Sequence, residues 1–152
     1  LTPDMGVQEK QGLNTYTLRQ RTEGYLDGMK AADLLDEVSI LTKGSLEEKL
    51  EKFIKQNDFS SKTALLCLCD SYAIDAMTYL QNKGILVPEQ VGIMGYDDVD
   101  QLKYIHPRIT TIKYSVLRMG KIAIDMLFQN MEQKIDNQEC LLEYEIVDGE
   151  SL

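Results

Sequence analysis

Residues 91–100, VGIMGYDDVD, are an apolar run that ends on three carboxylates, Asp97, Asp98 and Asp100. A short continuous apolar run is typical of a strand buried inside a parallel sheet. Ligands of open parallel sheets bind outside the carboxyl ends of the strands. This stretch therefore predicts a buried strand with a polar binding site directly after it.

A second apolar run, TALLCLC at residues 63–69, precedes the first and is followed by Asp70. We expect a central strand here that is covered on both faces. A helix between the two runs, which Asp70 or Ser71 would cap, is predicted by apolar residues at helical spacing and a closing glycine, namely Ala73, Ala76, Met77, Leu80 and Gly84. Strand, helix and strand in this order predict parallel strands joined by a right-handed crossover.

Helix-like and strand-like segments also alternate on both sides of this unit. Upstream, we expect a helix at 17–35, a short strand at 38–41 and a helix that begins at the capping box of Ser45 and Glu48. Downstream, we expect an extended connector at 106–115, a helix capped by Ser115 and a late strand at 140–147. The last helix would turn an apolar stripe inward, formed by Val116, Met119, Ala123, Met126 and Leu127. The prediction is an α/β fold, a parallel sheet with helices on both faces.

Composition limits the classes of function. A chain of 152 residues is long enough for one domain with a hydrophobic core. Its 25 acidic and 16 basic residues give a net charge of −9, and no stretch concentrates Lys or Arg. Because phosphate backbones are bound mainly through clustered cations, these residues alone should bind DNA or RNA poorly. No apolar run approaches the roughly 20 residues that span a bilayer, and residues 1–10 lack a secretory signal pattern, so we expect a cytoplasmic protein without membrane contact.

The cysteines and the single histidine do not indicate catalysis or metal binding. Cys67, Cys69 and Cys140 are expected to be reduced and to pack as small hydrophobic residues. A Cys-x-Cys pair would need more metal ligands, and His106 has no His or Cys neighbour to join it. No Ser or Cys can be placed with His106 and an acid as a triad. We therefore predict no metal, no cofactor and no enzymatic activity.

The aspartates after the two strands have two interpretations. Asp70 can simply cap its helix, and DDVD can be a solvated turn whose Asp side chains bond to their own backbone. Alternatively, carboxylates at this edge of the sheet accept paired hydrogen bonds from vicinal hydroxyl groups or from a cation. From the residues alone, the structural interpretation is favoured for Asp70, and the two are evenly balanced for Asp97.

An ordered series of motifs then narrows the function. RTEGY at 21–25 is followed by the apolar strand ending on Cys69 and Asp70, and then by GILVPE at 84–89, VGIMGYDD at 91–98, PRITTI at 107–112 and MGKIA at 119–123. Each motif is weak alone, but their succession is specific. In this order they resemble the effector-binding core of the lactose-repressor/galactose-repressor (LacI/GalR) family of transcriptional regulators. The closing EIVDGESL resembles the end of that core, with Gly149 where the family usually has Arg.

The resemblance implies a periplasmic-binding-protein-like fold of two α/β lobes that close on a small ligand, commonly a sugar. It implies that Arg21 and Asp97 contact polar groups of the ligand, and that Cys69 faces the pocket at a position where the family usually has Asn. A thiol is a poor hydrogen-bond partner, so another side chain holds that ligand hydroxyl or the ligand lacks it. Asp70 is a second choice for ligand binding.

By resemblance, the chain is a partial effector-binding domain. Residues 1–106 would form the C-terminal lobe, 107–135 the crossover and a helix normally belonging to the N-terminal lobe, and 136–152 the returning strand. Most of the N-terminal lobe and the DNA-binding head would be absent, and DNA would be contacted only through that head. The stripe of the helix at 115–131 would lose its usual cover, so we expect this helix either to pack back on the lobe or to pair with a second chain in a homodimer.

The prediction is thus the ligand-sensing domain of a LacI/GalR-like regulator, which binds a sugar or related metabolite and modulates DNA binding by an upstream head. One alternative is a sugar-binding protein of a transport system, which shares the fold, although the reduced cysteines and the absent export signal weigh against it. The other is a phosphoryl receiver domain with clustered Asp residues at strand ends. In this chain the acidic pair follows Asp70, which is the wrong order for a receiver.

Overall fold

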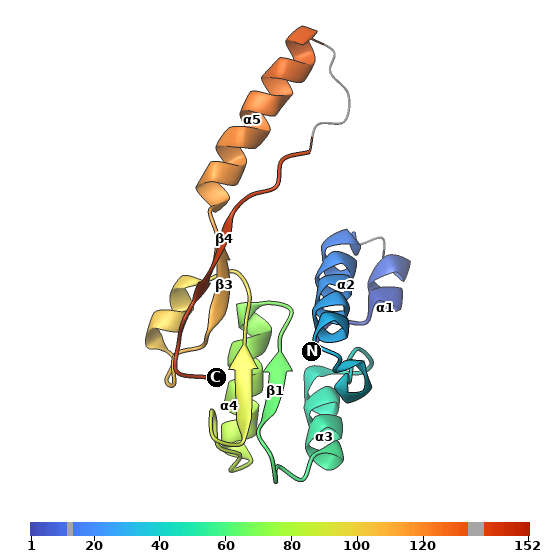
Figure 1. Cartoon of the computed structure of the whole chain (residues 1–152), viewed down its shortest axis with the longest axis vertical. Helices are drawn as coiled ribbons and strands as arrows, with labels where there is room; N and C mark the ends of the chain where they lie inside the picture. Colours follow the sequence, from blue (N-terminus) through green and yellow to red (C-terminus); the bar gives the residue numbers. More distant parts are fainter. Residues whose placement is uncertain (12–13, 134–138) are drawn as a thin grey trace.

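The computed structural model describes residues 1–11, 14–133 and 139–152 and shows a small α/β core from which one long helix projects (Figure 1). The strands are β1 (Thr63–Leu66), β2 (Val91–Met94), β3 (Thr111–Tyr114) and β4 (Tyr144–Val147). The α-helices are α1 (Met5–Lys10), α2 (Tyr16–Ala31), α3 (Leu46–Gln56), α4 (Asp70–Asn82) and α5 (Val116–Gln133). Two short 3₁₀ helices are η1 (Leu35–Glu37) and η2 (Asp100–Tyr104). None of the described helices is long and apolar enough to cross a bilayer.

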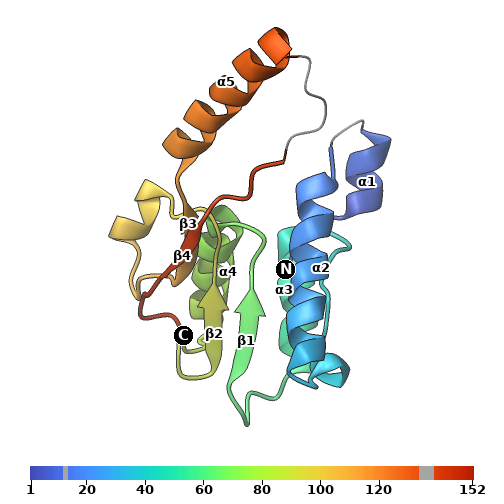
Figure 2. The same cartoon turned by 45° about the horizontal axis from the view of Figure 1, so that its top comes forward.

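The centre of the fold is the predicted strand–helix–strand unit. β1 and β2 are parallel neighbours, with Thr63 opposite Val91 and Leu66 opposite Met94. Helix α4 lies behind the two strands in Figure 2 and buries the predicted stripe of Ala73, Ala76, Met77 and Leu80. These side chains form one apolar cluster with residues of α3, β1 and β2, among them Leu50, Phe53, Leu65, Val91 and Ile93. The central part of the fold prediction is therefore confirmed.

Local side-chain chemistry explains where the helices begin and end. The capping box before α3 is confirmed, since Ser45 accepts a hydrogen bond from the Glu48 N–H and the Glu48 carboxylate accepts one from the Ser45 N–H. Gly84 follows α4 with φ +78°, as expected for a left-handed stop. The predicted cap of α4 is wrong, because its N-cap is Cys69, which makes no side-chain capping bond. Asp70 is instead the first helical residue, and its carboxylate is bonded elsewhere.

The predicted strand at 38–41 is also wrong. The segment is extended but pairs with no strand in the described part of the chain. Its neighbours are the first two residues, of which Thr2 donates its N–H to the Leu41 carbonyl at 3.1 Å. The expected cover on both faces of β1 is also missing, because Ala64 and Leu66 are exposed.

A second small sheet follows the core. β3 lies inside the predicted connector and pairs antiparallel with β4, with Thr111 opposite Val147 and Tyr114 opposite Tyr144. A single parallel bridge between Met94 and Thr110 links this part of the chain to β2. The late strand thus exists but is shorter than predicted, and it joins β3 rather than the parallel sheet.

The long helix α5 lies outside the core. Ser115 caps it as predicted, accepting a hydrogen bond from the Arg118 N–H at 3.1 Å. Its predicted inward stripe is wrong, since the side chains of Val116 and Leu127 are 67% and 57% exposed and the helix extends away from the sheets (Figure 1). Helix α5 therefore does not pack back on the core.

The C-terminal residues anchor the chain without the arginine usual in the family. Ser151 is fully buried, donates its hydroxyl to the Ile93 carbonyl and accepts a hydrogen bond from the Thr110 N–H at 2.9 Å. Gly149 lies so close to the segment that leads into β3 that an added Cβ would be 2.3 Å from the Arg108 carbonyl oxygen. The close approach of the backbone at Gly149 and the buried hydroxyl of Ser151 together hold this end against β2.

Candidate functional site

The centre of the candidate site is a direct contact between Arg21 of α2 and Asp97, which follows β2. The Arg21 Nη2 group lies 3.3 Å from Oδ1 of Asp97, and Nη1 donates to the Leu68 carbonyl at 2.6 Å. The two side chains are 28% and 29% exposed, so the pair is partly shielded but open to a ligand. Although 76 positions separate these residues, the fold brings them together at the carboxyl ends of β1 and β2.

Two tyrosines complete the immediate surroundings of this pair. The Arg21 guanidinium lies 3.6 Å from the centre of the Tyr96 ring, a cation–π contact that fixes its plane. Tyr114 of β3 donates its hydroxyl to Oδ1 of Asp97 at 3.2 Å, and its ring is 5.7 Å from that of Tyr96. Burial and the nearby Asp97 carboxylate raise the pKa of Tyr114, which therefore remains a donor at neutral pH.

The backbone that carries Asp97 is unusual. Asp97 and Asp98 have φ values of +116° and +52°, in the left-handed region that few non-glycine residues adopt. Two backbone contacts to β3 hold this turn: the Asp97 N–H donates to the Ile112 carbonyl at 2.8 Å, and the Asp98 N–H donates to the Thr111 hydroxyl at 3.4 Å. Asp and Asn tolerate this conformation better than bulkier residues, which accounts for the acidic pair at this place.

Asp70 stabilises the same turn through hydrogen bonds. Its fully buried carboxylate accepts hydrogen bonds from the Thr111 hydroxyl at 2.6 Å and from the Val99 N–H at 2.9 Å. Its own N–H donates to the Tyr96 carbonyl at 2.8 Å. The structure thus places Asp70 beneath the site, bonded to protein groups on both sides.

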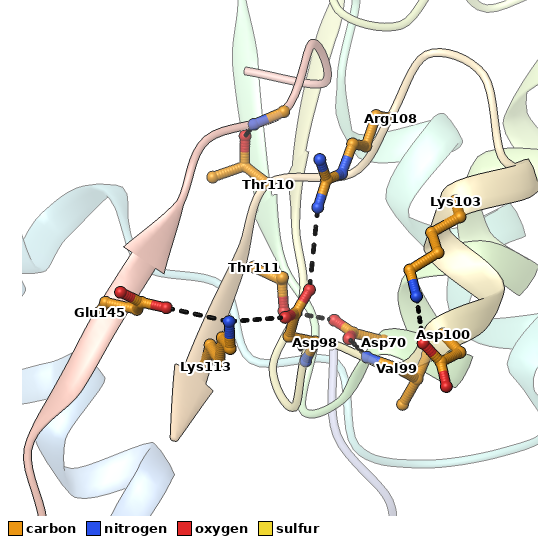
Figure 3. A network of polar contacts seen from close by, with 11 residues as sticks. Asp70, Asp98, Val99, Asp100, Lys103, Arg108, Thr110, Thr111, Lys113 and Glu145 are labelled. Carbon is orange, nitrogen blue, oxygen red and sulfur yellow. Dashed lines mark hydrogen bonds and ion pairs between the residues drawn. The ribbon is translucent and has the colours of Figure 1, made fainter. Parts of the chain in front are cut away.

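The remaining carboxylates of DDVD pair with lysine and arginine side chains (Figure 3). The Asp98 carboxylate lies 3.9 Å from the Arg108 guanidinium group and 3.7 Å from the Lys113 ammonium group. The Lys113 ammonium group also lies 3.1 Å from the carboxylate of Glu145 in β4. Glu145 and Asp98 together raise the pKa of Lys113. Asp100 pairs with Lys103 one turn along η2. The segment is therefore not a turn in which each Asp bonds only to its own backbone.

Arg21 and Tyr96 also line an open groove of about 840 Å³ that extends along β1. Asp97 is bonded to Arg21 at this end of the groove, and in the described part of the chain its Oδ2 atom has no hydrogen-bond partner. A carboxylate oxygen and guanidinium N–H groups side by side can bind a ligand that both donates and accepts hydrogen bonds, such as a vicinal diol.

The three cysteines are free, as expected, but only Cys67 is fully buried. Cys69 is half-buried at the start of α4, one residue from the Leu68 carbonyl that accepts from Arg21. Cys140 is exposed, so the expected hydrophobic packing fails there. Within the described ranges, no group of three or more His, Cys, Asp or Glu side chains could hold a metal ion.

Sequence reasoning missed Tyr96, Thr111 and Tyr114 as parts of the site. Tyr96 could have been predicted from the sequence, because it directly precedes the acidic pair in a strand-end motif. Tyr114 was not, because the segment that contains it was expected to be a connector rather than a strand beside β2. The ladder with β4 fixes which face of β3 carries each side chain.

Comparison with known proteins identifies the family. Residues 8–152 match the family model of the periplasmic binding protein-like domain. The chain is 35% identical over 127 residues to the HTH-type transcriptional repressor PurR of Haemophilus influenzae, and 30% identical over 135 residues to the HTH-type transcriptional regulator MalR of Clostridium butyricum. These alignments cover 80% and 83% of this chain but only 37% and 40% of the two regulators. The relatives favour the regulator prediction over the transport and receiver alternatives.

Solved structures agree on the fold. A LacI family transcriptional regulator from Enterococcus faecium with bound ribose superimposes with a TM-score of 0.73 at 20% identity, over 99% of this chain and 54% of that one. The lac repressor dimer bound to operator and an anti-inducer gives 0.73 at 20% identity, over 89% of this chain and 48% of the repressor. The predicted resemblance to LacI/GalR-type regulators is confirmed, and the chain belongs to the family of periplasmic binding protein-like domains.

Proposed function

We propose that this chain is the ligand-sensing part of a transcriptional regulator and that it binds a sugar or a related small polar metabolite beside Arg21 and Asp97. The observation that carries the proposal is the partly exposed contact of these two side chains at the end of a groove. An ion pair that served stability alone would gain little from this exposure, since partly exposed pairs contribute about 0–1 kcal/mol.

The surroundings of the pair support a polar, hydroxyl-bearing ligand. Tyr96 stacks on Arg21, and the Tyr114 hydroxyl reaches Asp97, so aromatic faces and polar groups lie side by side. Sugars present the same combination of apolar faces and hydroxyl edges. In this proposal Cys69 borders the ligand without a strong hydrogen bond, and Asp70 acts on the ligand through the turn that it holds.

The proposed division of the chain into lobes is the one predicted from the sequence. Residues 1–106 form one lobe, 107–135 cross toward a second lobe, and 136–152 return. The projection of α5 away from the core supports this division. DNA would be contacted through a separate head, because this chain carries a net charge of −9. In this proposal the chain acts in the cytoplasm and has no catalytic activity.

The exposed apolar side chains of α5 support a homodimer. They are Val116, Leu117, Met119, Ile124, Leu127, Phe128 and Met131. An isolated helix with this many exposed apolar side chains is a candidate association surface. A second copy of the chain is the proposed occupant, because most soluble oligomers are homodimers with a two-fold axis.

Thermal unfolding with a panel of pentoses, hexoses, disaccharides and nucleosides tests ligand binding, since a ligand that binds the folded state raises the melting temperature. We expect at least one compound, at about 100 times its Kd, to stabilise the folded state by roughly 2.7 kcal/mol, which raises the melting temperature of a chain of this size by about 5–10 °C. Asp97→Asn and Arg21→Lys should each remove this rise. Asp75→Asn, an exposed change on α4, should retain it. Equal rises in all four proteins would contradict the proposed site.

A further inference from the structure

The acidic turn, formed by Asp97 and Asp98, is held less firmly at Asp98 than at Asp97. The Asp97 N–H donates to the Ile112 carbonyl at 2.8 Å. The Asp98 N–H donates to the Thr111 hydroxyl at 3.4 Å, which is close to the upper limit of a hydrogen bond. Both aspartates have a positive φ, a conformation that persists in residues other than glycine only when the surroundings hold it. The position of Asp98 therefore depends on the contacts of its side chain.

Two cations from different positions flank the Asp98 carboxylate. The Arg108 guanidinium group lies 3.9 Å from Oδ1, and the Lys113 ammonium group lies 3.7 Å from Oδ2. Both distances are longer than a hydrogen bond, so the attraction is electrostatic. Each cation can therefore strengthen its hold on Asp98 if it moves closer.

Lys113 is shared between the acidic turn and β4. Its ammonium group lies between the carboxylates of Asp98 and Glu145 (Figure 3) and is closer to Glu145, at 3.1 Å. Lys113 and Glu145 are opposite each other in the β3–β4 ladder, which keeps this pair together. Hydrogen bonding to Glu145 is the main cause that raises the pKa of Lys113, followed by the charges of Glu145 and Asp98. An ammonium group that is bonded to Glu145 is drawn away from Asp98.

We infer that Lys113 is a positioning residue for ligand binding, which holds the acidic turn, and thereby Asp97, through the Asp98 carboxylate. Glu145 weakens this hold, because it competes for the same ammonium group. The inference rests on the proposed function, since it concerns the regulation of that same site. β3 contacts both residues of the acidic turn, because Tyr114 donates to Asp97 and the neighbouring Lys113 attracts Asp98.

The directions of the two effects separate this role from ordinary stabilisation. A sugar is uncharged, and Lys113 and Glu145 lie outside the set of residues that line the groove, so their charges do not act on the sugar directly. Loss of the Lys113 charge releases Asp98 and weakens binding. Loss of the Glu145 charge leaves Lys113 to Asp98 and strengthens binding. Ion pairs that served only the stability of the sheet would be lost after either change, with effects in the same direction.

Isothermal titration calorimetry tests these directions with the compound that most raises the melting temperature among the pentoses, hexoses, disaccharides and nucleosides. Lys113→Gln should weaken binding about threefold, and Lys113→Arg, which keeps the charge, should bind within about 1.5-fold of the unmodified chain. Glu145→Gln should strengthen binding about twofold. These factors are of the size expected for partly exposed ion pairs. Changes in the same direction for Lys113→Gln and Glu145→Gln would overturn the inference.

Matched variants test whether both effects depend on one ammonium group. In a chain that carries Lys113→Gln, Glu145→Gln should have no further effect, because the group for which Glu145 competes is absent. Glu143→Gln removes a carboxylate that pairs with Arg118 two positions before Glu145, and Lys103→Gln removes an exposed cation of η2. Both should leave the affinity unchanged. An equal gain from Glu145→Gln with and without Lys113, or a threefold loss in either control, would contradict the inference.

Hydrogen exchange of the Asp98 amide, measured without sugar, separates failure of the inference from failure of the proposed function. Exchange should be about threefold faster in Lys113→Gln and about twofold slower in Glu145→Gln, because the acidic turn opens more often in the first and less often in the second. If no compound binds the unmodified chain, the proposed function is wrong, and the positioning role is overturned with it. If a compound binds the unmodified chain and both variants equally well, or if exchange of the Asp98 amide is the same in all three, only the inference is overturned.

Discussion

At the scale of single residues, the acidic cluster after β2 is held by cations from distant parts of the chain. Asp97 forms an ion pair with Arg21 of α2, and Asp98 forms ion pairs with Arg108 and Lys113. The sequence predicted that Arg21 and Asp97 serve one site only through the family resemblance, because spacing along the chain contains no information on contacts 76 positions apart. The left-handed backbone of Asp97 and Asp98 was beyond prediction, since it depends on hydrogen bonds to β3.

The buried carboxylate of Asp70 gives a first prediction. Asp70→Asn replaces one of the two accepting carboxylate oxygens by an NH₂ group, which cannot accept the hydrogen bond from Thr111 or from Val99 at that position. We expect the free energy of unfolding to fall by about 3 kcal/mol, because hydrogen bonds to buried charged groups contribute about 1.5–3 kcal/mol each. Urea denaturation measures this. The exposed Asp75→Asn on the same helix is the control and should change stability by less than about 0.5 kcal/mol; equal losses would show that Asp70 does not brace the turn.

Cys67 gives a prediction about pH. Burial raises the pKa of the Cys67 thiol from 9.0 to about 12, so the folded protein keeps this proton where the unfolded chain loses it. The thiol's contribution to stability is therefore complete below pH 9 and is lost as the pH rises toward 12, with a slope of at most about 1.4 kcal/mol per pH unit. Urea denaturation between pH 8 and pH 10.5 should show a shallower decline for Cys67→Ala than for the unmodified chain. The exposed Cys140→Ala should follow the unmodified chain, and identical slopes for all three proteins would exclude this role.

At the scale of elements, substitution by alanine should have opposite effects on stability at Gly149 and at Gly120. A Cβ at Gly149 would lie 2.3 Å from the Arg108 carbonyl oxygen, whereas nothing lies within 4 Å of a Cβ at Gly120 in α5. Gly149→Ala should destabilise the protein by about 2 kcal/mol through overpacking, and Gly120→Ala should stabilise it by about 0.8 kcal/mol through helix propensity. Chemical denaturation measures both, and a change of the same sign in the two variants would contradict the packing of the C-terminal segment.

Elements with strong local patterns were predictable, and elements defined by their neighbours were not. The helix after Ser45 and the unit from 63 to 96 follow from capping, periodicity and apolar runs. The strand at 38–41 was predicted from the same kind of pattern but has no partner strand among the residues that the structure describes. Helix α5 was expected to turn a stripe inward because its sequence is amphipathic, yet a sequence pattern does not specify whether a covering layer is present.

At the scale of the whole molecule, the core and α5 differ in the burial of their apolar side chains. The core buries its own apolar side chains, whereas those of α5 remain exposed. The proposed homodimer predicts concentration-dependent association in sedimentation experiments, because covering this surface removes apolar area from water. Phe128→Glu should weaken association at least about tenfold, and Tyr104→Glu, at an 82% exposed residue of η2 outside α5, should not. A monomer at all concentrations would contradict the homodimer.

The chain spans about 37–40% of the length of the repressors that it resembles. Its proposed function therefore depends on the site that the chain itself contains, where Arg21, Tyr96, Asp97 and Tyr114 converge. Asn at position 97 keeps the left-handed backbone and most of the side-chain shape but removes the charge. This makes Asp97→Asn a direct probe of ligand binding, separate from folding.

As proposed, the convergence of these four side chains binds a small polar ligand. Isothermal titration calorimetry of the unmodified chain and of Asp97→Asn, with the compound that gives the largest thermal shift, tests it most directly. We predict that the substitution weakens binding at least about tenfold, or 1.4 kcal/mol, as expected for the loss of a charge-assisted hydrogen bond. Equal affinities of the two proteins would contradict the claim and would reduce the Arg21–Asp97 contact to an ordinary ion pair.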